Sequence, residues 1–489
     1  MKICFILGQN ESLGIEYLSS FLKQNGQKVD LLFDPCLFND SITSIPWLAQ
    51  KFSRESFILS EIKKIQPDLI GFQVFTDTLP WNMHLAEYIK KHYPLIKIVF
   101  GGIHPTSVPE EMLQHECVDF VIRGEGEHAL LELMQTLSQQ KNPENIKNLS
   151  YRDNNRIIHH TPLRPLISNL DTLPFPDKEL FYTKALPTKG YKIMTSRGCP
   201  FNCSYCYNHV VKELYGFPKN FVRRRSVKNV IDELVIAKNR WRTNKIFFDD
   251  DIFISDKEWL EEFVAEYIEK ITLPNFCFVH PVYINEKTIN LLKKMNTQLV
   301  EIGIQTIDPE YRKKIYQRHY SQEQLKKALH LIYQSKIPCI ADNIIDYETI
   351  TEEEALRITQ FYLNEKICKV YLFNLRIFPH TQIAHLLNRK KELPVPKEEQ
   401  NYFSIVKAKR LKNIQKIFIM ILFGKIFPKR FTPYLLKTRL YRFFPLLNYH
   451  FLLELFYAIE ISLRRKALFN RETSSKYIRY ILKKIFRRF

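Results

Sequence analysis

The stretch that decides the fold is MTSRGCPFNCSYCYN, residues 194–208, which carries Cys199, Cys203 and Cys206 in a C-x3-C-x2-C spacing. Three thiols in one loop can hold three irons of a cubane cluster and leave the fourth iron open to another ligand. Structural zinc is an alternative, with His209 as the nearby fourth ligand, but zinc sites usually combine two cysteine pairs and no second C-x2-C pair exists. A disulfide would leave one thiol over.

The same loop carries a family resemblance. RGCPFNCSYCYN, residues 197–208, resembles the cluster loop of the radical S-adenosylmethionine (radical SAM) superfamily, and Tyr205 before the third cysteine fits that loop as well. The resemblance implies that Cys199, Cys203 and Cys206 hold a 4Fe-4S cluster whose open iron binds SAM. It also implies that Tyr205 packs near the adenine of SAM.

Length and composition limit the number of domains and the class of protein that are possible. A chain of 489 residues predicts two or three domains, and its nine unevenly spaced cysteines do not form a secreted disulfide framework. The first ten residues, MKICFILGQN, read as a short strand and not as a signal peptide, so we expect a cytoplasmic protein. The net charge of +20 is concentrated at one end: residues 401–489 hold 21 Lys+Arg and 3 Asp+Glu, whereas the other residues hold 51 and 49.

Residues 1–145 alternate apolar runs with helical stretches. Continuous apolar runs separated by helices indicate a parallel sheet covered on both faces, and five such units predict a flavodoxin/Rossmann-like domain with its ligand at the carboxyl ends of the strands. The expected strands are Lys2–Leu7, Val29–Phe33, Leu69–Val74, Ile96–Phe100 and Phe120–Ile122.

Four blocks of this domain resemble the cobalamin-binding domain that precedes many radical SAM domains: LGIEYLSSFLKQNG (13–26), PDLIGFQVFT (67–76), GGIHPT (101–106) and VDFVIRGEGE (118–127). The resemblance implies a cobalamin held by Gly101, Gly102, His104, Thr106, Gly124, Glu125 and Gly126. The D-x-H-x-x-G motif of a histidine lower ligand is missing, because His84 and His104 lack its Asp and Gly. A fold retained without its cofactor is the alternative.

Residues 146–185 predict a small hairpin around Asp153-Asn154-Asn155, followed by a proline-containing linker. Residues 186–390 then show six strand–helix units, which predict a (βα)6 partial barrel with its chemistry at the carboxyl ends of the strands. The family resemblance implies that SAM contacts come from those ends. The candidates, besides Tyr205, are Asp249, Asp250, Glu301, Gln305 and Arg318.

Residues 391–489 predict a basic, mainly helical region. The apolar stretch 443–463 has the length of a membrane span, but Pro, Asn, His and Glu residues interrupt it. We therefore expect amphipathic helices that cap the active site and touch an anionic membrane surface. A solvated basic face and a nucleic-acid partner are the alternatives, and the aromatic and aliphatic content argues against nucleic acid.

Together the resemblances imply a cobalamin-dependent radical SAM enzyme. We expect it to methylate an unactivated carbon of an unknown small-molecule or lipid-like substrate, with flavodoxin or ferredoxin as electron donor. Oxidative ring closure, a methylthiotransferase and a non-catalytic cofactor-binding sensor are the alternatives. The expected location is the cytoplasm, with contact to the inner face of the membrane through the basic region.

Overall fold

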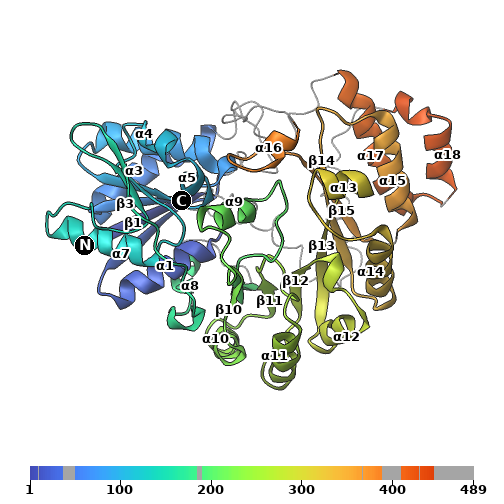
Figure 1. Cartoon of the computed structure of the whole chain (residues 1–489), viewed down its shortest axis with the longest axis horizontal. Helices are drawn as coiled ribbons and strands as arrows, with labels where there is room; N and C mark the ends of the chain where they lie inside the picture. The colour runs from blue at the N-terminus through green and yellow to red at the C-terminus, as the bar shows by residue number, and fades with distance from the viewer. Residues whose placement is uncertain are drawn as a thin grey trace, which may run out of the picture.

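The computed structural model describes residues 1–8, 10–36, 50–183, 190–365, 367–387, 409–428 and 430–444. Two α/β domains lie side by side, and a third, helical region packs against the second of them (Figure 1). The first domain is built on a seven-stranded sheet and the second on a six-stranded sheet. This arrangement confirms the predicted fold class.

The N-terminal sheet has the order β2-β1-β3-β4-β5-β6-β7. Its first five strands are parallel, and their order 2-1-3-4-5 is that of flavodoxin-like folds. They are β1 (Lys2–Gly8), β2 (Lys28–Asp34), β3 (Leu69–Gln73), β4 (Lys97–Gly101) and β5 (Phe120–Ile122). The predicted hairpin forms as β6 (Leu149–Arg152) and β7 (Ile158–His160), and it extends this sheet with antiparallel pairs, so the sheet continues beyond residue 145.

Helices cover both faces of the N-terminal sheet because its strands alternate their apolar side chains. On β1, Ile3, Phe5 and Leu7 enter one core cluster, whereas Cys4 and Ile6 enter the other. The helices of the domain are α1 (Leu13–Gln24), α3 (Glu55–Ile65), α4 (Leu79–His92), α5 (Ile103–Ser107), α6 (Pro109–Leu113) and α7 (Glu127–Ser138).

The predicted linker is anchored to the N-terminal domain. Its helix α8 (Lys178–Tyr182) buries Leu180 and Phe181 in the core cluster that also contains Ile3, Phe5 and Leu7 of β1. The ammonium group of Lys178 is fully buried and pairs with Glu11 at 2.8 Å and Glu16 at 2.7 Å. Because breaking a buried ion pair leaves an unpaired charge, this contact fixes the linker strongly.

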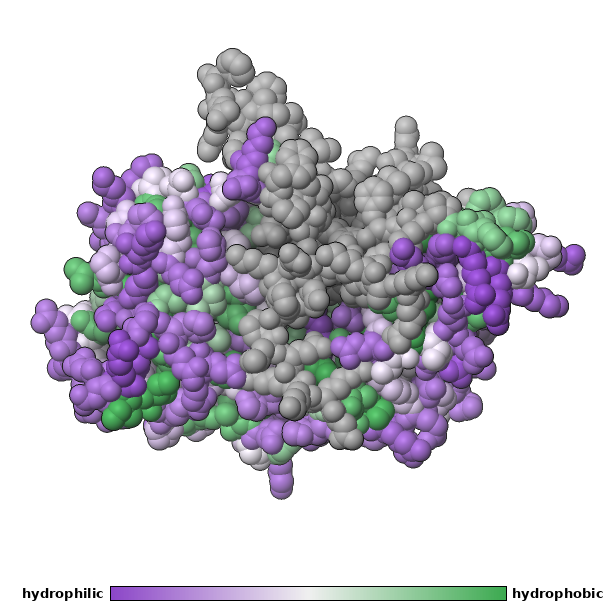
Figure 2. All heavy atoms as spheres, turned by 90° about the horizontal axis from the view of Figure 1, so that it is seen from above, coloured by the Kyte–Doolittle hydropathy of each residue, from purple (hydrophilic) through white to green (hydrophobic). Residues whose placement is uncertain are grey.

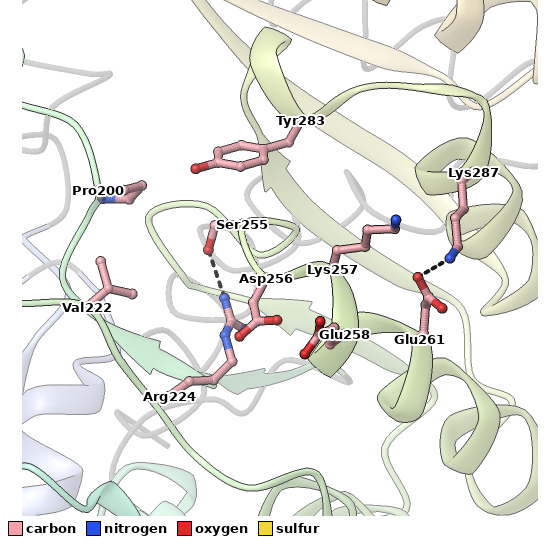
Figure 3. A pocket seen from close by; sticks show the side chains of 10 residues that line it. All are labelled: Pro200, Val222, Arg224, Ser255, Asp256, Lys257, Glu258, Glu261, Tyr283 and Lys287. Atoms are coloured by element: carbon pink, nitrogen blue, oxygen red, sulfur yellow. Dashed lines mark hydrogen bonds and ion pairs between the residues drawn. The ribbon is translucent and has the colours of Figure 1, made fainter. Parts of the chain in front are cut away.

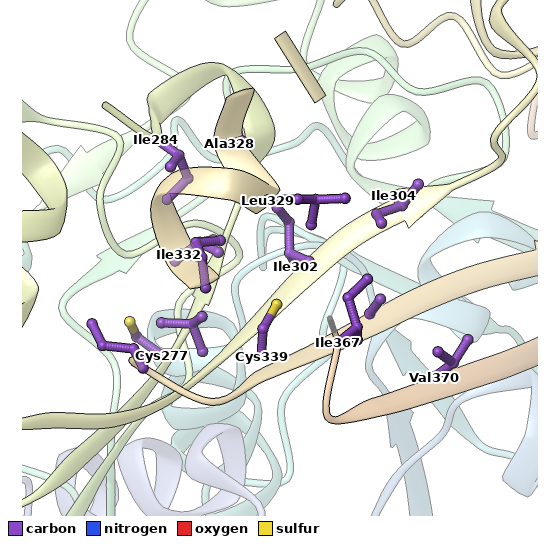
Figure 4. Packing of buried hydrophobic residues seen from close by; sticks show 14 of the residues in the cluster. Cys277, Ile284, Ile302, Ile304, Ala328, Leu329, Ile332, Cys339, Ile367 and Val370 are labelled. Atoms are coloured by element: carbon purple, nitrogen blue, oxygen red, sulfur yellow. The ribbon is translucent and has the colours of Figure 1, made fainter. Parts of the chain in front are cut away.

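The second sheet consists of six parallel strands in the order β15-β14-β13-β12-β11-β8, an open partial barrel as predicted. The strands are β8 (Gly190–Ile193), β11 (Lys245–Phe248), β12 (Asn275–Val279), β13 (Thr297–Gln305), β14 (Cys339–Ile345) and β15 (Lys369–Asn374). The helices between them are α10 (Val227–Arg240), α11 (Lys257–Lys270), α12 (Glu286–Lys294), α14 (Gln322–Gln334) and α15 (Glu352–Asn364). Cys277 and Cys339 lie in the packed layer between strands and helices (Figure 4).

Helix α17 (Lys409–Ile426) packs on α15, and α18 (Phe431–Lys437) packs on α17, so the two C-terminal helices lie outside the barrel helices (Figure 1). The carboxylate of Glu352 anchors them by accepting hydrogen bonds from Asn413, Tyr441 and Arg442. The expectation that helices of this region cap the active site is therefore wrong for α17 and α18. The stretch 443–463 lies outside the described residues from position 445 onward.

Within the described residues, no helix combines the length and the apolar character needed to cross a membrane.

Candidate active site between the two sheets

The cysteine loop connects β9 (Ser196–Arg197) to α9 (Tyr207–Leu214). Gly198 opens the loop with φ of +89°, and a Cβ atom there would lie 2.6 Å from the carbonyl oxygen of Phe221, so only glycine fits. Cys206 is the N-cap residue of α9, and its amide donates a hydrogen bond to the carbonyl of Cys203 at 3.1 Å. The turn therefore keeps the last two cysteines of the motif close together.

The thiols lie in partly or fully buried surroundings. Cys203 is buried, and Cys199 and Cys206 are half-buried. Burial raises the pKa of Cys199 to about 12 and that of Cys206 to about 11, and the nearby thiols contribute to both shifts. Metal binding to these thiols must therefore release protons, because the thiolate is the ligand form.

The donor set fits an iron–sulfur cluster better than zinc. In the described part of the chain, no group of three His, Cys, Asp or Glu side chains lies close enough together to hold a metal ion. The ring of His209, the fourth ligand of the zinc alternative, lies against Phe217 at 5.5 Å between centroids. Three thiols on one loop match a cluster with one open iron, whereas tetrahedral zinc needs a fourth ligand.

Arg318 connects the cysteine loop to the barrel. Its guanidinium donates to the Tyr205 hydroxyl at 3.1 Å and to the carbonyl of Gly303 at 2.6 Å, and it lies 3.6 Å from the sulfur of Cys203. Burial alone would lower the pKa of Arg318, but Tyr205 and Cys203 raise it, so the group stays charged. The structure thus brings the predicted residues Tyr205 and Arg318 together beside a cluster thiol.

The side chain of Gln305 approaches that of Arg318 because strand β13 has a bulge near its end. The register between β13 and β14 shifts between Gly303 and Gln305, and Gln305 adopts φ of +66°. A Cβ atom on Gly303 would lie 2.8 Å from the Gln305 amide nitrogen and 3.5 Å from the Arg318 guanidinium. The bare glycine therefore leaves space in which these two polar side chains approach each other.

Glu301 has a partner that the sequence analysis missed. It faces Asp342 of the neighbouring strand β14, and burial raises the pKa of both carboxyls, with Glu301 raising that of Asp342 further. Two neighbouring carboxyls of this kind share a proton. An acidic residue within the otherwise buried strand β14 was the available signal.

The three aspartates after β11 divide between two roles. Asp250 is buried and accepts hydrogen bonds from the Thr195 amide at 3.0 Å and from the Thr195 hydroxyl at 2.8 Å. It braces the strand that leads into the cysteine loop and does not face the cavity described below. Asp249 and Asp251 do face that cavity. Asp251 was missed, although alternate residues of an extended segment share one side.

A cavity of about 610 Å³ lies between the two sheets. Its N-terminal wall comes from the carboxyl ends of all five parallel strands, where flavodoxin-like folds bind their ligands. Its other wall comes from the ends of β8 and β11, the start of the cysteine loop and α9. Residues of the two walls include Gly8, Gln73, Gly102 and Gly124 on one side and Arg197, Gly198, Asn208 and Asp251 on the other.

Five of the seven residues predicted to contact cobalamin line this cavity: Gly101, Gly102, Gly124, Glu125 and Gly126. Gly102 has φ of +102°, and a Cβ atom there would lie 3.0 Å from the carbonyl oxygen of Val74. Thr106 supports the wall from behind by accepting a hydrogen bond from the Gly124 amide at 3.0 Å. His104 is buried and hydrogen-bonded to the Thr76 hydroxyl at 2.9 Å.

The wall fits a bulky planar cofactor without a histidine ligand. Four glycines at the ends of β4 and β5, Gly101, Gly102, Gly124 and Gly126, let the backbone approach a large ligand closely. Among the described residues that line the cavity there is no histidine. His84 lies on α4 and pairs with Glu55 at 3.1 Å instead.

The two walls are joined by polar contacts that the sequence did not reveal. Glu125 accepts hydrogen bonds from Arg197 at 3.0 Å and Arg223 at 2.7 Å, so this predicted cobalamin residue also holds the domains together. The hydroxyls of Thr76 and Tyr207 bond to each other across the interface. Because Tyr207 directly follows Cys206, this bond ties the N-terminal wall to the cysteine loop.

A second, more open hollow of about 710 Å³ borders the cysteine loop only at Pro200 (Figure 3). Its charged side chains come mainly from α11 and α12, and several are already satisfied. Lys287 pairs with Glu261, and Arg224 donates to the Ser255 hydroxyl at 2.9 Å. The cavity between the two sheets is therefore the better candidate site.

Comparison with known proteins agrees with this geometry. The family model of the B12 (cobalamin) binding domain matches residues 6–134, and that of the Radical SAM superfamily matches residues 193–362. An uncharacterized methyltransferase of Pyrococcus horikoshii is 30% identical over 333 residues, which are 63% of this chain and 66% of that protein. The anaerobic magnesium-protoporphyrin IX monomethyl ester cyclase of Rubrivivax gelatinosus is 26% identical, covering 69% of this chain and 59% of that protein. The chain thus spans about two thirds or less of the length of these relatives.

Among solved structures, the radical SAM methyltransferase TsrM of Kitasatospora setae superposes with a TM-score of 0.62 at 15% identity, over 78% of this chain and 75% of that one. This likeness supports the fold alone. The two domain models occur in the predicted order, on either side of one cavity. The chain therefore belongs to the cobalamin-binding radical SAM proteins, which confirms the predicted family and its set of cofactors: a 4Fe-4S cluster, SAM and cobalamin.

Proposed function

We propose that the protein is a cobalamin-dependent radical SAM methyltransferase that methylates an unactivated carbon. The observation that carries the proposal is the shared cavity, since one wall bears the cobalamin-type strand ends and the other bears the flank of the cysteine loop. Two cofactors that act on one substrate must reach the same space. The relatives named as a methyltransferase and a cyclase support this class of chemistry.

The protein's own residues would bind the cofactors, orient them and shield them. Cys199, Cys203 and Cys206 would hold the cluster, and glycines of the opposite wall would admit the corrin ring. When bound, the cluster with SAM and the cobalamin supply a 5′-deoxyadenosyl radical and a methyl group, respectively. Asp249 and Asp251 face the cavity and can accept hydrogen bonds from a cationic amino group such as that of SAM.

Residues on the barrel side would help to orient the bound molecules. Arg318 is held by Tyr205 and Gly303, so its fixed charge can contact a carboxylate close to the cluster. Gln305 lies beside it as an amide donor and acceptor. Glu301 and Asp342 hold one exchangeable proton between them and can donate a hydrogen bond to a polar group of the substrate.

The test uses anaerobically purified protein with a reconstituted cluster, cobalamin, a reductant and SAM labelled on its methyl group. We expect 5′-deoxyadenosine and labelled methylcobalamin, measured by mass spectrometry. An intact cluster that yields neither product would leave the non-catalytic sensor as the better reading. Formation of 5′-deoxyadenosine without labelled methylcobalamin would favour oxidative ring closure, the second candidate, which the cyclase relative supports.

A methylthiotransferase is the weaker alternative, because it needs a second cysteine trio in the N-terminal domain. Cys4 and Cys117 belong to a core cluster there, whereas Cys36 lines the cavity.

The proposal also includes a flavodoxin or ferredoxin as electron donor, a cytoplasmic location and a lipid-like substrate. We do not expect nucleic acid as a partner.

A further inference from the structure

The C-terminal helices expose an unusual number of large apolar side chains. Five of the fifteen exposed large hydrophobic residues in the described chain lie within residues 427–443: Phe427, Phe431, Tyr434, Leu440 and Phe443, which are 37–84% exposed. The other ten are scattered over the remaining sequence. Single exposed apolar residues are ordinary, but five within one 17-residue segment indicate an interaction surface.

The segment that contains these residues carries only basic charges. Residues 409–444 contain ten Lys+Arg and no Asp or Glu. Arg430, Lys437 and Arg439 are exposed, and none of the three forms an ion pair with another described residue. Residues 1–400 nearly balance 51 Lys+Arg with 49 Asp+Glu, so the strong positive charge of the sequence lies in its C-terminal region, to which this segment belongs.

The aromatic groups are held in a fixed layer. Helix α18 turns Leu435 and Leu436 inward and Phe431, Tyr434 and Lys437 outward. The Phe427 ring packs against that of Phe431 at 5.1 Å and against that of Phe423 at 5.3 Å. Figure 2 shows hydrophobic and hydrophilic residues next to each other at the end of the molecule that carries α18.

We propose that the surface formed by residues 427–428 and 430–443 docks on a bilayer leaflet with anionic headgroups. Interleaved aromatic and basic side chains suit the boundary between headgroups and acyl chains, where rings insert and cations meet phosphates. The chain continues directly from Phe443 into its apolar stretch 443–463, which extends the same chemistry in sequence. The proposal goes beyond methyl transfer and does not depend on it, since vesicle binding is measured without turnover.

The first experiment is flotation of the full-length, cofactor-loaded protein with vesicles of phosphatidylcholine alone or with 30% phosphatidylglycerol. We expect binding to the anionic vesicles only, weakened by salt. The double variant Lys437→Glu, Arg439→Glu should lower the partition coefficient at least about 25-fold, on the order of fivefold for each basic group near the surface. Its matched control, Lys293→Glu with Lys294→Glu on α12, has the same charge change and should bind like the natural protein.

A second pair of variants tests the apolar part. Phe431→Ser with Phe443→Ser should lower vesicle binding, whereas Leu95→Ser with Ile157→Ser, also exposed but in the N-terminal domain, should not. Equal losses in variant and control, or no loss in either, would overturn the proposal. Iron and cobalamin content of each variant reports whether it has folded.

Hydrogen exchange of the unmodified protein gives a measurement that needs no variant. Anionic vesicles should protect the amides of residues 427–443. Protection confined to other segments would overturn the proposal. So would tight binding of a single-stranded RNA probe with no binding to vesicles, or a dimer that buries this face in the absence of lipid.

Discussion

The two walls of the central cavity differ in what they offer to a ligand. The N-terminal wall presents glycines and backbone at its strand ends, with Gly101, Gly102, Gly124 and Gly126 among its lining residues. The barrel side presents two cavity-facing aspartates, Asp249 and Asp251, and the start of the cysteine loop, whose three thiols lie outside the cavity lining. The first wall offers a cofactor its shape, whereas the barrel side offers charged groups and, beyond the cavity wall, thiols that can ligate a metal cluster. Variants of the two walls should therefore fail in different ways.

The largest expected effect is on the ligating side. Cys203→Ala removes one of three cluster ligands, so iron binding and 5′-deoxyadenosine formation should fall to background, as measured by iron analysis and mass spectrometry. Cobalamin binding should persist, because the opposite wall is unchanged. Cys277→Ala, in the packed core of the same barrel, is the control and should retain iron. Cluster-dependent activity that survives Cys203→Ala would contradict the ligand assignment.

The next largest effect is expected for a variant of the N-terminal wall of the cavity. Gly102→Ala places a Cβ atom 3.0 Å from the Val74 carbonyl at a φ of +102°, so the loop must move and cobalamin affinity should fall at least about tenfold. Gly26→Ala shares the positive φ but has open space around it, so it should cost about 1 kcal/mol of stability and leave affinity unchanged. Cobalamin titration followed by absorbance measures both variants. Iron content should remain normal in each.

A third prediction tests the contact between the walls. Burial alone would raise the pKa of Glu125, but Arg197 and Arg223 hold it below its ordinary value. A carboxyl with a lower pKa in the folded chain stabilises the fold above its unfolded pKa of about 4.3, and this contribution is lost as pH falls through the folded pKa. Glu125→Gln should therefore cost about 2 kcal/mol at pH 7, less than a fully buried pair because the carboxylate is partly exposed.

Denaturant unfolding at several pH values measures this effect. The difference between the natural protein and Glu125→Gln should shrink as pH falls from about 5 towards 3. Glu116→Gln is the control, since Glu116 forms exposed ion pairs with Arg152 and Arg156 and should change stability by less than about 1 kcal/mol. A constant difference across this pH range would refute the interdomain role of the Glu125 charge.

The smallest expected effect concerns the bond between Tyr207 and Thr76. Tyr207→Phe removes one hydrogen bond and keeps the ring that packs on Phe378 at 4.7 Å. The expected cost is about 1 kcal/mol, seen as an up to fivefold weaker cobalamin affinity with unchanged iron content. Tyr434→Phe, on the exposed C-terminal face, should leave that affinity unaltered. A loss of iron in Tyr207→Phe would mean that the bond supports the cluster loop itself.

The sequence predicted the two sheets closely because their strands are continuous apolar runs between helices. Strand β5 has the predicted bounds, and the other four parallel strands of the N-terminal sheet differ from expectation by one residue at one or both ends. The motif cysteines and the glycine-rich strand ends were also visible, since both depend on local spacing. The hairpin was found, but its pairing with β5 could not be read from local pattern.

Contacts between distant segments were not predictable in this way. The roles of Asp250 and Asp251 depend on which side of one short segment meets Thr195, and a sequence of three adjacent aspartates does not specify it. Asp342 becomes a partner of Glu301 only through the register of β13 and β14. Likewise, the sequence shows Glu125 only as part of a glycine-rich loop, and its contacts with two arginines arise from the fold. These are properties of tertiary structure.

The division of one cavity between two successive domains also has a consequence for how the protein is made. The strand ends of the N-terminal sheet are complete in the chain by residue 127, whereas Asp249 and Asp251 follow much later. At roughly 5–20 residues per second, the ribosome leaves the first wall uncovered for several seconds before the second can close over it. This interval is a loading window, in which the strand ends that form the N-terminal wall are open to a cofactor before the second wall covers them.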